Sequence, residues 1–364
     1  MKFSINKEIL IEIMGDYINI LKENPIKPIL AGLFIQAKDE KIIFKGTNLE
    51  IDLIRYTDGK IETEGQVLIK PALLLEYIKL VEETDINFQK EEGSLIVNHA
   101  EFSILDDSSY PELTETTPAT ILTTNTNKFA NLLDKVKFIT SISGTNDLLF
   151  SSIKMIFKDN FIELASTDSY RLIYLKDQIP NNEYKEVLVP AESVSIIHKI
   201  FKDLDEDFSL SATDEKLILT WKNSYFSCKL LSLSFPNFKA LIESNNNDKK
   251  FEFNREELVS SLKKVISVTK NSNDSKNVAT FNFRGNELLI SGFSTSAKIN
   301  QKVSMIKNGD DLKLGMNCKY IKDFIDNINN NIIIEAKNAN SMLRITEESN
   351  PDYIYLVMPV NIRV

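Results

Sequence analysis

The feature of this sequence that most limits its fold is an internal repeat, because a pattern that recurs at a fixed period indicates copies of one structural unit. In three segments a short apolar stretch runs into Asn, and apolar residues then follow at helical spacing. Asn is a favoured N-cap, since its side chain accepts hydrogen bonds from the first free amides of a helix. The segments are FSINKEILIEIM from Phe3, LTTNTNKFANLL from Leu122 and FEFNREELVSSL from Phe251, with Asn6, Asn125 and Asn254 as the caps. Each segment predicts a strand that leads into a capped helix.

A second set of three segments follows the same order. An apolar stretch leads into an amphipathic pattern in VLIKPALLLEYIKLV from Val67, VLVPAESVSIIHKIF from Val187 and LKLGMNCKYIKDFI from Leu312. Their starts lie 120 and 125 residues apart. Alternating apolar and polar segments with turn residues surround them, which is typical of hairpin strands. Three unrelated domains would not predict matching caps in a matching order, so the sequence predicts an α+β fold of three similar units, each with two helices and many short strands.

The predicted domains are residues 1–118, 119–245 and 246–364, with linkers at 110–121 and 243–250. A chain of 364 residues is too long for one ordinary core and fits two or three domains. The opening MKFSINKEIL lacks an apolar stretch of signal-peptide length, and no segment approaches the ~20 apolar residues that cross a bilayer. We therefore expect a cytoplasmic protein without membrane attachment.

Charge and residue usage limit the classes of function. The formal net charge is −9, and because nucleic-acid affinity comes largely from Lys and Arg, such a chain should not grip free DNA strongly overall. Basic residues gathered on one surface remain compatible with this charge. The two cysteines, Cys228 and Cys318, and the two histidines, His99 and His198, form no metal-binding cluster. With 11 glycines the chain also has no phosphate-binding glycine loop, so we expect no cofactor and no metal.

Five motifs, in order along the chain, carry a family resemblance. They are MKFSINKEIL at the start, GTNLEIDL at Gly46–Leu53, ASTDSYRL at Ala165–Leu172, FPNFKALI at Phe235–Ile242 and YLVMPV at Tyr355–Val360. Together with the threefold repeat, they resemble the bacterial DNA polymerase III beta subunit, the sliding clamp, from the first residue to the last. The resemblance implies three clamp domains, each with two helices and two small antiparallel sheets, that form half of a closed ring.

The function implied by this resemblance is not enzymatic. Two chains would close head to tail around duplex DNA, without reading its sequence, and confer processivity on the replicative polymerase. The implied partners are the DNA polymerase III alpha subunit, a clamp loader, and other polymerases and repair proteins that carry a clamp-binding motif of Gln followed by apolar residues. Ring closure would pair the edge strand around Glu101 to Leu105 with the strand around Ala297 to Val303 of the other chain.

The resemblance also implies two sets of site residues. Lysines on the predicted inner helices would face DNA: Lys7, Lys22, Lys128, Lys135, Lys199, Lys202, Lys263, Lys264, Lys319 and Lys322. Partner peptides would enter a groove lined by Phe150, Thr167, Ser169, Tyr170, Arg171, Leu172, Pro236, Leu241, Asn340, Met342, Leu356, Met358, Pro359 and Val360. For the lysines the alternative is mixed solvated helix faces, and for the apolar groove residues it is an ordinary core.

Two positions and the C-terminal tail depart from the family pattern. Asn24 and Tyr170 stand where relatives often carry Arg and His, and the tail MPVNIRV continues past the usual end. Two other functions stay open at this point. An enzyme could use carboxylates such as Asp168, although no second carboxylate lies at a compatible spacing. A repeat protein could also bind partners without DNA.

Overall fold

The computed structural model describes residues 1–140, 147–272, 276–307 and 309–361, and these residues form two compact units. Unit 1 consists of Met1–Asn131, Phe157–Asn160 and Ile179–Ser232. Unit 2 consists of Leu132–Ile156, Phe161–Gln178 and Leu233–Val364. Helix α3 (Thr126–Lys137) and strand β11 (Ser152–Lys158) each run from one unit into the other.

Unit 1 contains α1, α2, α4 and a short 3₁₀ helix. These helices are α1 (Lys7–Ile18), η1 (Pro28–Ala31), α2 (Pro71–Leu80) and α4 (Ala191–Phe201). The first strands of the unit are β1 (Lys2–Asn6), β2 (Leu33–Lys38), β3 (Lys41–Thr47), β4 (Ile51–Asp58), β5 (Lys60–Thr63), β6 (Gly65–Ile69), β7 (Asp85–Lys90), β8 (Ser94–Val97) and β9 (Ala100–Ser103). The later strands are β10 (Thr120–Asn125), β14 (Lys185–Pro190), β15 (Asp207–Ala212), β16 (Lys216–Trp221) and β17 (Ser224–Lys229).

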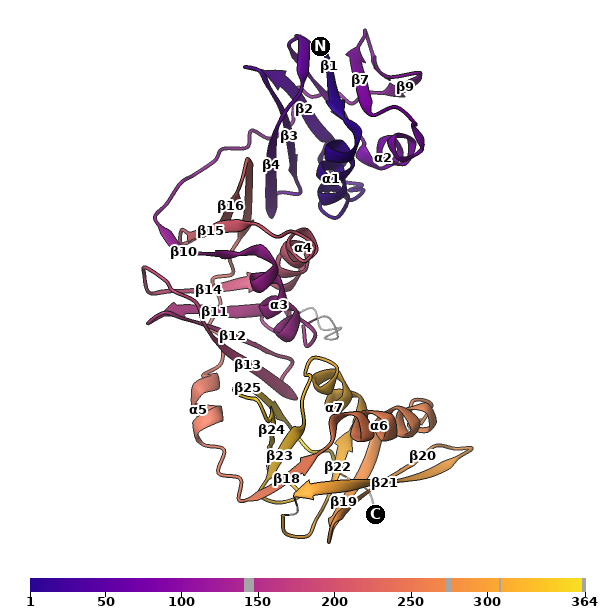
Figure 1. The fold of residues 1–364 in the computed structure, drawn as a ribbon, viewed down its shortest axis with the longest axis vertical. Helices are drawn as coiled ribbons and strands as arrows, with labels where there is room; N and C mark the ends of the chain where they lie inside the picture. Colours follow the sequence, from indigo (N-terminus) through magenta and orange to yellow (C-terminus); the bar gives the residue numbers. More distant parts are fainter. Residues whose placement is uncertain (141–146, 273–275, 308, 362–364) are drawn as a thin grey trace. The chain divides into compact units, whose positions relative to one another are not determined.

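Two antiparallel sheets organise unit 1. One has the strand order β5-β1-β7-β8-β9, and the other has the order β10-β15-β16-β17-β4-β3-β2-β6. The second sheet joins distant parts of the sequence, because β4 pairs with β17 from Arg55↔Ser224 to Ile51↔Cys228. Helices α1 and α2 pack against each other (Figure 1). Tyr17 of α1 is fully buried, and its hydroxyl donates to the backbone oxygen of Phe44, which fixes α1 on the strands beneath it.

Unit 2 contains α5 (Phe238–Glu243), α6 (Arg255–Thr269) and α7 (Cys318–Ile325). Its strands are β12 (Phe161–Thr167), β13 (Arg171–Gln178), β18 (Lys249–Phe253), β19 (Val278–Arg284), β20 (Glu287–Phe293), β21 (Lys298–Lys307), β22 (Leu312–Asn317), β23 (Ile332–Ala336), β24 (Leu343–Glu347) and β25 (Asn350–Val357). They form one continuous run in the order β12-β13-β25-β24-β23-β18-β21-β20-β19-β22. The last strand of the chain therefore lies in the interior of a sheet, and Tyr353 to Val357 are at most 5% exposed.

The local signals in the sequence correctly located the helices that they predicted. The side chains of Asn6, Asn125 and Asn254 each accept hydrogen bonds from amides in the first turn that follows them. Asn317 caps α7 in the same way, and Pro71 begins α2, where its missing amide hydrogen costs nothing. Helix α5 was missed, because its six residues are too few for an apolar period and its main start signal is Asn237, which accepts from the Ala240 amide.

Candidate functional site

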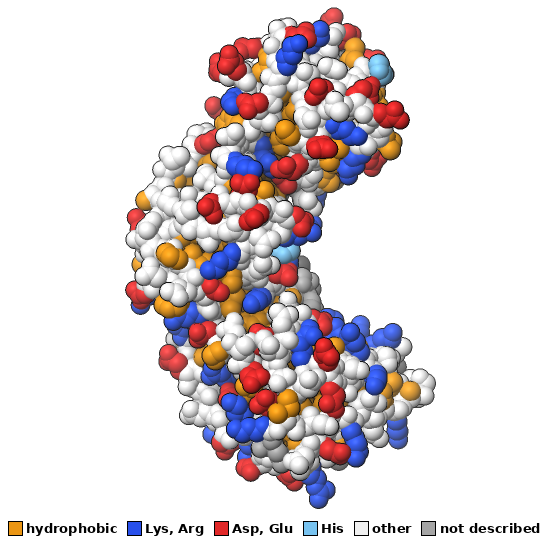
Figure 2. All heavy atoms as spheres, viewed as in Figure 1, with side chains coloured by type: hydrophobic (Ala, Val, Ile, Leu, Met, Phe, Trp, Pro, Cys, Tyr) orange, Lys and Arg blue, Asp and Glu red, His pale blue; other side chains and the backbone are white. Residues whose placement is uncertain are grey.

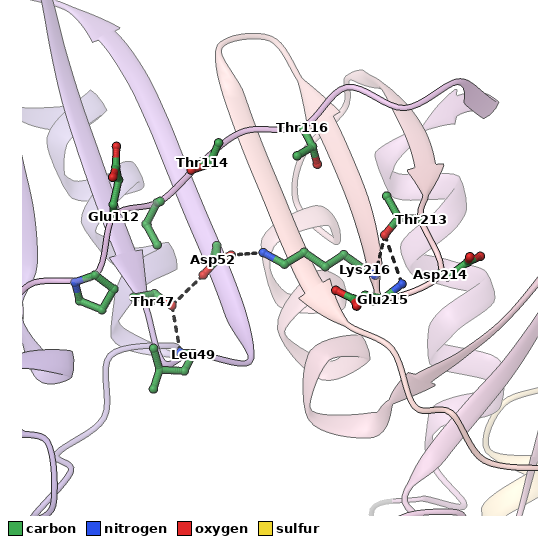
Figure 3. A pocket seen from close by; sticks show the side chains of 12 residues that line it. Thr47, Leu49, Asp52, Glu112, Thr114, Thr116, Thr213, Asp214, Glu215 and Lys216 are labelled. Atoms are coloured by element: carbon green, nitrogen blue, oxygen red, sulfur yellow. Dashed lines mark hydrogen bonds and ion pairs between the residues drawn. The ribbon is translucent and has the colours of Figure 1, made fainter.

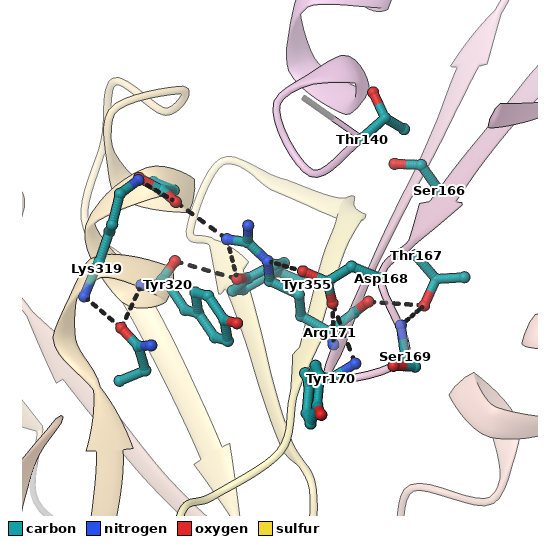
Figure 4. Close-up of polar contacts among 12 residues, drawn as sticks. Thr140, Ser166, Thr167, Asp168, Ser169, Tyr170, Arg171, Lys319, Tyr320 and Tyr355 are labelled. Carbon is teal, nitrogen blue, oxygen red and sulfur yellow. Dashed lines mark hydrogen bonds and ion pairs between the residues drawn. The ribbon is translucent and has the colours of Figure 1, made fainter. Parts of the chain in front are cut away.

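The residues predicted to line a groove centre on the turn between β12 and β13. Thr167 ends β12 and Arg171 begins β13, and Ser169 between them has a φ of 73°, which is unusual for a residue other than glycine. Asp168 holds the turn, since its Oδ1 accepts from the backbone amides of Tyr170 (3.1 Å) and Arg171 (3.0 Å). The Thr167 hydroxyl donates to the Arg171 backbone oxygen at 2.8 Å. The turn is thus fixed by its own side chains (Figure 4).

Arg171 joins this turn to two other elements of unit 2. Its fully buried side chain donates from Nε to Asp168 (2.8 Å) and from Nη1 to Asp323 of α7 (3.1 Å). Nη1 also reaches the Tyr355 hydroxyl of β25 at 3.4 Å, and that hydroxyl donates to the backbone oxygen of Tyr320 at 3.1 Å. The guanidinium lies 4.0 Å from the centre of the Tyr320 ring. Figure 4 shows these side chains converging on Arg171 from the turn, α7 and β25.

Electrostatics keep this cluster in one protonation state. Burial alone would lower the pKa of Arg171, but its contacts with Tyr355 and Asp168 outweigh burial and raise the pKa. Burial raises the pKa of the Tyr355 hydroxyl, against the lowering influence of Arg171. Arginine is charged at any physiological pH and Tyr355 stays neutral. Among the described residues, Nη2 of Arg171 has no hydrogen-bond partner, so one nitrogen of a buried cation lacks an acceptor.

An apolar cluster lies beside the turn. It contains Leu172, Phe238 of α5 and Leu356 of β25, with Met342 packed against it. Strands β13 and β25 pair in the register Leu172↔Leu356, and the Met358 amide continues the pairing by donating to the Tyr170 backbone oxygen at 2.9 Å. Tyr170 and Met358, which each lie two residues from one of the buried leucines in the sequence, are 64% and 43% exposed. Apolar surface is therefore left open where the two strands end together.

The other predicted groove residues divide between this place and a small cavity. Leu241 of α5 is 41% exposed, and Pro236 precedes that helix. Asn340 and Val360 line a cavity of about 260 Å³ with Gly315, and the Val360 amide donates to the Gly315 backbone oxygen at 2.8 Å, which anchors the start of the tail. Pro359 and Phe150 are both half-buried, Phe150 in the segment before β11. Residues 362–364 of the tail MPVNIRV lie outside the described residues.

Sequence reasoning missed the partners of Arg171. Tyr320, Asp323 and Tyr355 lie about 150 to 185 positions from Arg171 in the sequence, and no local pattern links them to it. It also placed Arg171 and Thr167 in the lining of the groove, whereas most of their polar groups bond within the turn and its surroundings. Only tertiary packing could have revealed this arrangement.

Most of the lysines predicted to face DNA have partners within the chain. Lys22 pairs with Glu192, Lys202 with Asp203, Lys319 with Asp323 and Lys322 with Asp326, while Lys7 and Lys199 bond the Val81 oxygen and the Asn19 side chain. Lys135 lies over the Tyr353 ring, and Lys128 is also engaged. Lys263 and Lys264 of α6 are exposed and have no side-chain partner among the described residues. Figure 2 shows basic side chains gathering over the part of unit 2 where Figure 1 draws α6 and α7.

A larger pocket in unit 1 is built on a similar turn. Leu49 has a φ of 74°, its amide donates to the Thr47 hydroxyl, and Asn48 caps the turn as Asp168 does in unit 2. The pocket of about 650 Å³ also contains Asp52, which accepts from Thr47 (2.7 Å) and pairs with Lys216 (2.8 Å) (Figure 3). Ser227 donates to Asp52 as well, at 3.1 Å. The polar groups on the floor of the pocket thus bond to one another.

Other chemistry-bearing residues have structural surroundings. Cys228 and Cys318 are buried, and burial raises the pKa of each thiol to about 12. His99 is exposed beside Glu83. Within the described ranges no group of three His, Cys, Asp or Glu residues could hold a metal ion. No described helix has the length and apolarity that a membrane span needs.

Comparison with known proteins gives a consistent result along the sequence. Residues 1–114 match the family described as "DNA polymerase III beta subunit, N-terminal domain", and residues 123–237 match the family described as "DNA polymerase III beta subunit, central domain". The beta sliding clamp of Staphylococcus epidermidis is 24% identical over 379 aligned positions, covering 99% of each chain. That of Staphylococcus aureus is 23% identical with the same coverage.

Solved structures share the fold. The beta subunit of DNA polymerase III from Thermotoga maritima superposes with a TM-score of 0.92 at 20% identity, and the sliding clamp of Bacillus subtilis with 0.91 at 22%, each over 100% of both chains. A sliding clamp from Pseudomonas aeruginosa, solved with griselimycin bound, gives 0.90 at 19% over 100% of both chains. The chain therefore belongs to the bacterial DNA polymerase III beta subunit family, the non-catalytic sliding clamps of DNA replication.

Proposed function

We propose that two copies of this chain close head to tail into a ring around duplex DNA and tether the replicative polymerase, and other replication and repair proteins, to it in the cytoplasm. Each copy would supply three domains, at residues 1–118, 119–245 and 246–364. The matched family descriptions, which end at residue 114 and at residue 237, support boundaries near these positions.

Repeated local geometry supports equivalent domains. The turns at Thr47–Ile51 and Thr167–Arg171 share a cap from the second residue and a positive φ at the third. Two-residue turns with positive φ at both positions recur 120 residues apart, at Asp39-Glu40 and Asp159-Asn160, and such turns suit the twist of paired strands. Matching turns at matching offsets are what duplicated domains would retain.

The proposed contact with DNA is weak and independent of sequence. Contacts to phosphates position a protein without reading bases, and a closed ring stays on DNA without strong affinity. Since most lysines of the predicted inner helices already have partners in the chain, few free cations remain to bind phosphates. Lys263 and Lys264 on α6 are the exposed exceptions among the ten predicted lysines within the described residues.

The proposed site for partners is the apolar surface where β13 and β25 end, which we call the peptide groove. Its exposed members are Tyr170, Leu241 and Met358, above the buried pair Leu172 and Leu356. Met fits varied apolar ligands because its side chain is flexible and polarisable. A peptide with Gln followed by leucine would place its apolar residues here, and the unpartnered Nη2 of Arg171 beneath could bind a peptide acceptor after a small local movement.

One observation carries the groove proposal: Tyr170 and Met358 are held side by side by a backbone hydrogen bond and remain exposed. The test is fluorescence anisotropy of a labelled peptide with a Gln-and-leucine clamp-binding motif, titrated with the full chain. We expect saturable binding in the micromolar range, roughly −8 kcal/mol. The variant Met358→Ala should weaken it about tenfold, whereas Ile26→Ala, at an exposed apolar residue of unit 1, should leave it unchanged. Equal affinity of both variants and the parent chain would refute the groove.

A further inference from the structure

The pocket in unit 1 is built on the same backbone scaffold as the peptide groove in unit 2. Strand β4 pairs with β17 in the way that β13 pairs with β25. Where the first pair ends, the Lys229 amide donates to the Glu50 backbone oxygen at 2.9 Å. Where the second pair ends, the Met358 amide donates to the Tyr170 backbone oxygen, also at 2.9 Å. The turns before β4 and β13 share their cap and their positive φ as well.

The segment that crosses each scaffold is also alike. Residues 110–113 read YPEL, and residues 235–238, which lie 125 positions further on, read FPNF. Leu113 packs on a buried cluster of β4, β16 and β17, and Phe238 is buried in a cluster that includes β13 and β25. The pocket is therefore the counterpart of the groove in the first part of the chain.

The side chains on the two scaffolds differ in chemistry. Asp52 and Ser227 take the place of the buried leucine pair of the groove, and they bond to each other at 3.1 Å. Glu50 and Lys229 take the place of its two exposed apolar residues and form an ion pair at 3.2 Å. A ligand that is apolar throughout would cover these charged groups without pairing them, which is costly. The pocket thus suits a ligand that differs from the one proposed for the groove.

The pocket carries negative charge that the chain leaves unpaired. Four carboxylates line it: Asp52, Glu112, Asp214 and Glu215. The first and third have ion-pair partners, Lys216 at 2.8 Å and Lys185 at 2.9 Å. Glu112 and Glu215 are exposed and have no ion-pair partner among the described residues. The ligand group that complements them is a cation.

The rest of the lining supplies apolar surface. Leu49 is 37% exposed, and Pro111 and Leu113 are half-buried. Figure 3 shows Leu49 on one side of the ion pair between Asp52 and Lys216, with Thr213 and Asp214 on the other side. The volume of about 650 Å³ is that of a typical ligand pocket. An apolar side chain and a neighbouring cation of one ligand therefore both find matching surface.

We propose that this pocket is a second docking site, which binds an extended segment of a partner protein with an arginine next to a large apolar residue. The arginine pairs with Glu215, because a guanidinium matches a carboxylate in shape and charge. The apolar residue contacts Leu49 and Leu113. Residues 111–115 form no backbone–backbone hydrogen bond with any described residue, so their free groups are open to the backbone of the segment. That the ligand is a peptide rests on the groove proposed above, whereas its positive charge rests on the pocket alone.

Fluorescence anisotropy of labelled peptides with the full chain tests the second site. The probe is the peptide Ser-Leu-Arg-Leu-Arg-Ser, and the charge-reversed control peptide carries glutamate in place of both arginines. We expect the probe to bind with a dissociation constant of about 50 μM. The control peptide should bind at least about tenfold more weakly, because it would place like charges together in the pocket.

Variants of the chain locate the binding. Glu215→Gln should weaken the probe about tenfold, since it removes a charge-assisted hydrogen bond. Leu49→Asn should weaken it about fivefold without changing the charge, because Asn tolerates the positive φ of 74° but offers no apolar surface. Glu92→Gln and Ile26→Asn make the same kinds of change at exposed residues elsewhere in unit 1, and they should leave the affinity for the probe unchanged.

The Gln-and-leucine peptide separates this site from the groove. Its binding should be unaffected by Glu215→Gln and Leu49→Asn, and near-ultraviolet circular dichroism checks that both variants are folded. If only the Gln-and-leucine peptide fails to bind the parent chain, the groove is overturned while the second site is supported by its own probe. No binding of the probe at about 1 mM, or equal affinity of the two pocket variants and the parent chain, overturns the second site. Loss of both peptides in the folded pocket variants overturns its separate preference for a cation.

Discussion

Replacing Arg171 with Met is expected to lower the free energy of unfolding of unit 2 by about 3 kcal/mol, at the low end of the 3–5 kcal/mol for breaking a buried ion pair. The side chain of Arg171 is fully buried, and those of Asp168 and Asp323 are 8% and 14% exposed. Solvent therefore screens the two ion pairs little, and removing the Arg171 cation leaves the carboxylates of Asp168 and Asp323 with less positive charge nearby.

The contacts that remain in Arg171→Met keep the loss of unfolding free energy at the low end of this range. Asp168 keeps its hydrogen bonds from the backbone amides of Tyr170 and residue 171, and Asp323 keeps Lys319 at 3.1 Å. Met fills much of the space of the arginine stem but loses the stacking on Tyr320. The expected loss of stability thus comes from carboxylates that lose their cation rather than from a cavity.

The assay is urea unfolding followed by near-ultraviolet circular dichroism, to which Tyr320, Tyr353 and Tyr355 of unit 2 contribute. Arg344→Met is the matched control, because Arg344 pairs with Glu335 at 3.6 Å with more than a quarter of each side chain exposed, and it should cost less than about 1 kcal/mol. Adding Asp323→Asn to Arg171→Met should recover part of the loss, because neighbouring residues do not act additively. A loss below about 1 kcal/mol for Arg171→Met would refute the reasoning.

Three further predictions concern charge and burial. Burial, opposed by Arg55, raises the pKa of Asp16 to about 6, so the folded chain keeps a proton that the unfolded chain releases near pH 4. The stability that this proton contributes is full below pH 4 and is lost as pH rises through 6. Relative to the parent chain, Asp16→Asn should therefore gain roughly 3 kcal/mol of unfolding free energy between pH 4 and 7, measured by urea unfolding followed by Trp221 fluorescence. Because burial raises the pKa of Cys228 and Cys318 to about 12, neither thiol should react with Ellman's reagent until the chain unfolds. Replacing Lys263 and Lys264 with Ala should lower the slope of log affinity for duplex DNA against log salt by about one for each lysine, measured by fluorescence anisotropy, and an unchanged slope would remove them from the DNA contact.

The sequence predicted well whatever depends on neighbours along the chain. A helix start needs only an Asn or Pro and the residues that follow it, so the caps at Asn6, Asn125 and Asn254 could be predicted from the sequence. The apolar run YIYLV near the end of the sequence forms β25, which lies in the interior of a sheet.

The sequence predicted poorly whatever depends on partners far along the chain. The burial of Arg171 requires an Asp three residues away and another 152 residues away, and only the fold brings them together. In the same way, a lysine on a helix reads as a free cation until the fold supplies its partner, as Glu192 does for Lys22. Charge that is counted along a segment therefore overstates the charge that a surface offers to DNA.

That distinction also changes what the acidic composition means. Residues 1–118 contain 22 acidic and 12 basic residues, residues 119–245 contain 16 and 14, and residues 246–364 contain 14 and 17, so the net charge of −9 is the sum of an acidic segment, a nearly balanced segment and a basic segment. Because phosphate contacts come from local basic residues, a basic segment can bind DNA in a chain whose total charge is negative. The exposed Lys263 and Lys264 lie in that basic segment. If the chain closes into the proposed ring, its contacts with DNA should weaken as salt is added even though its net charge is negative, because they depend on exposed lysines.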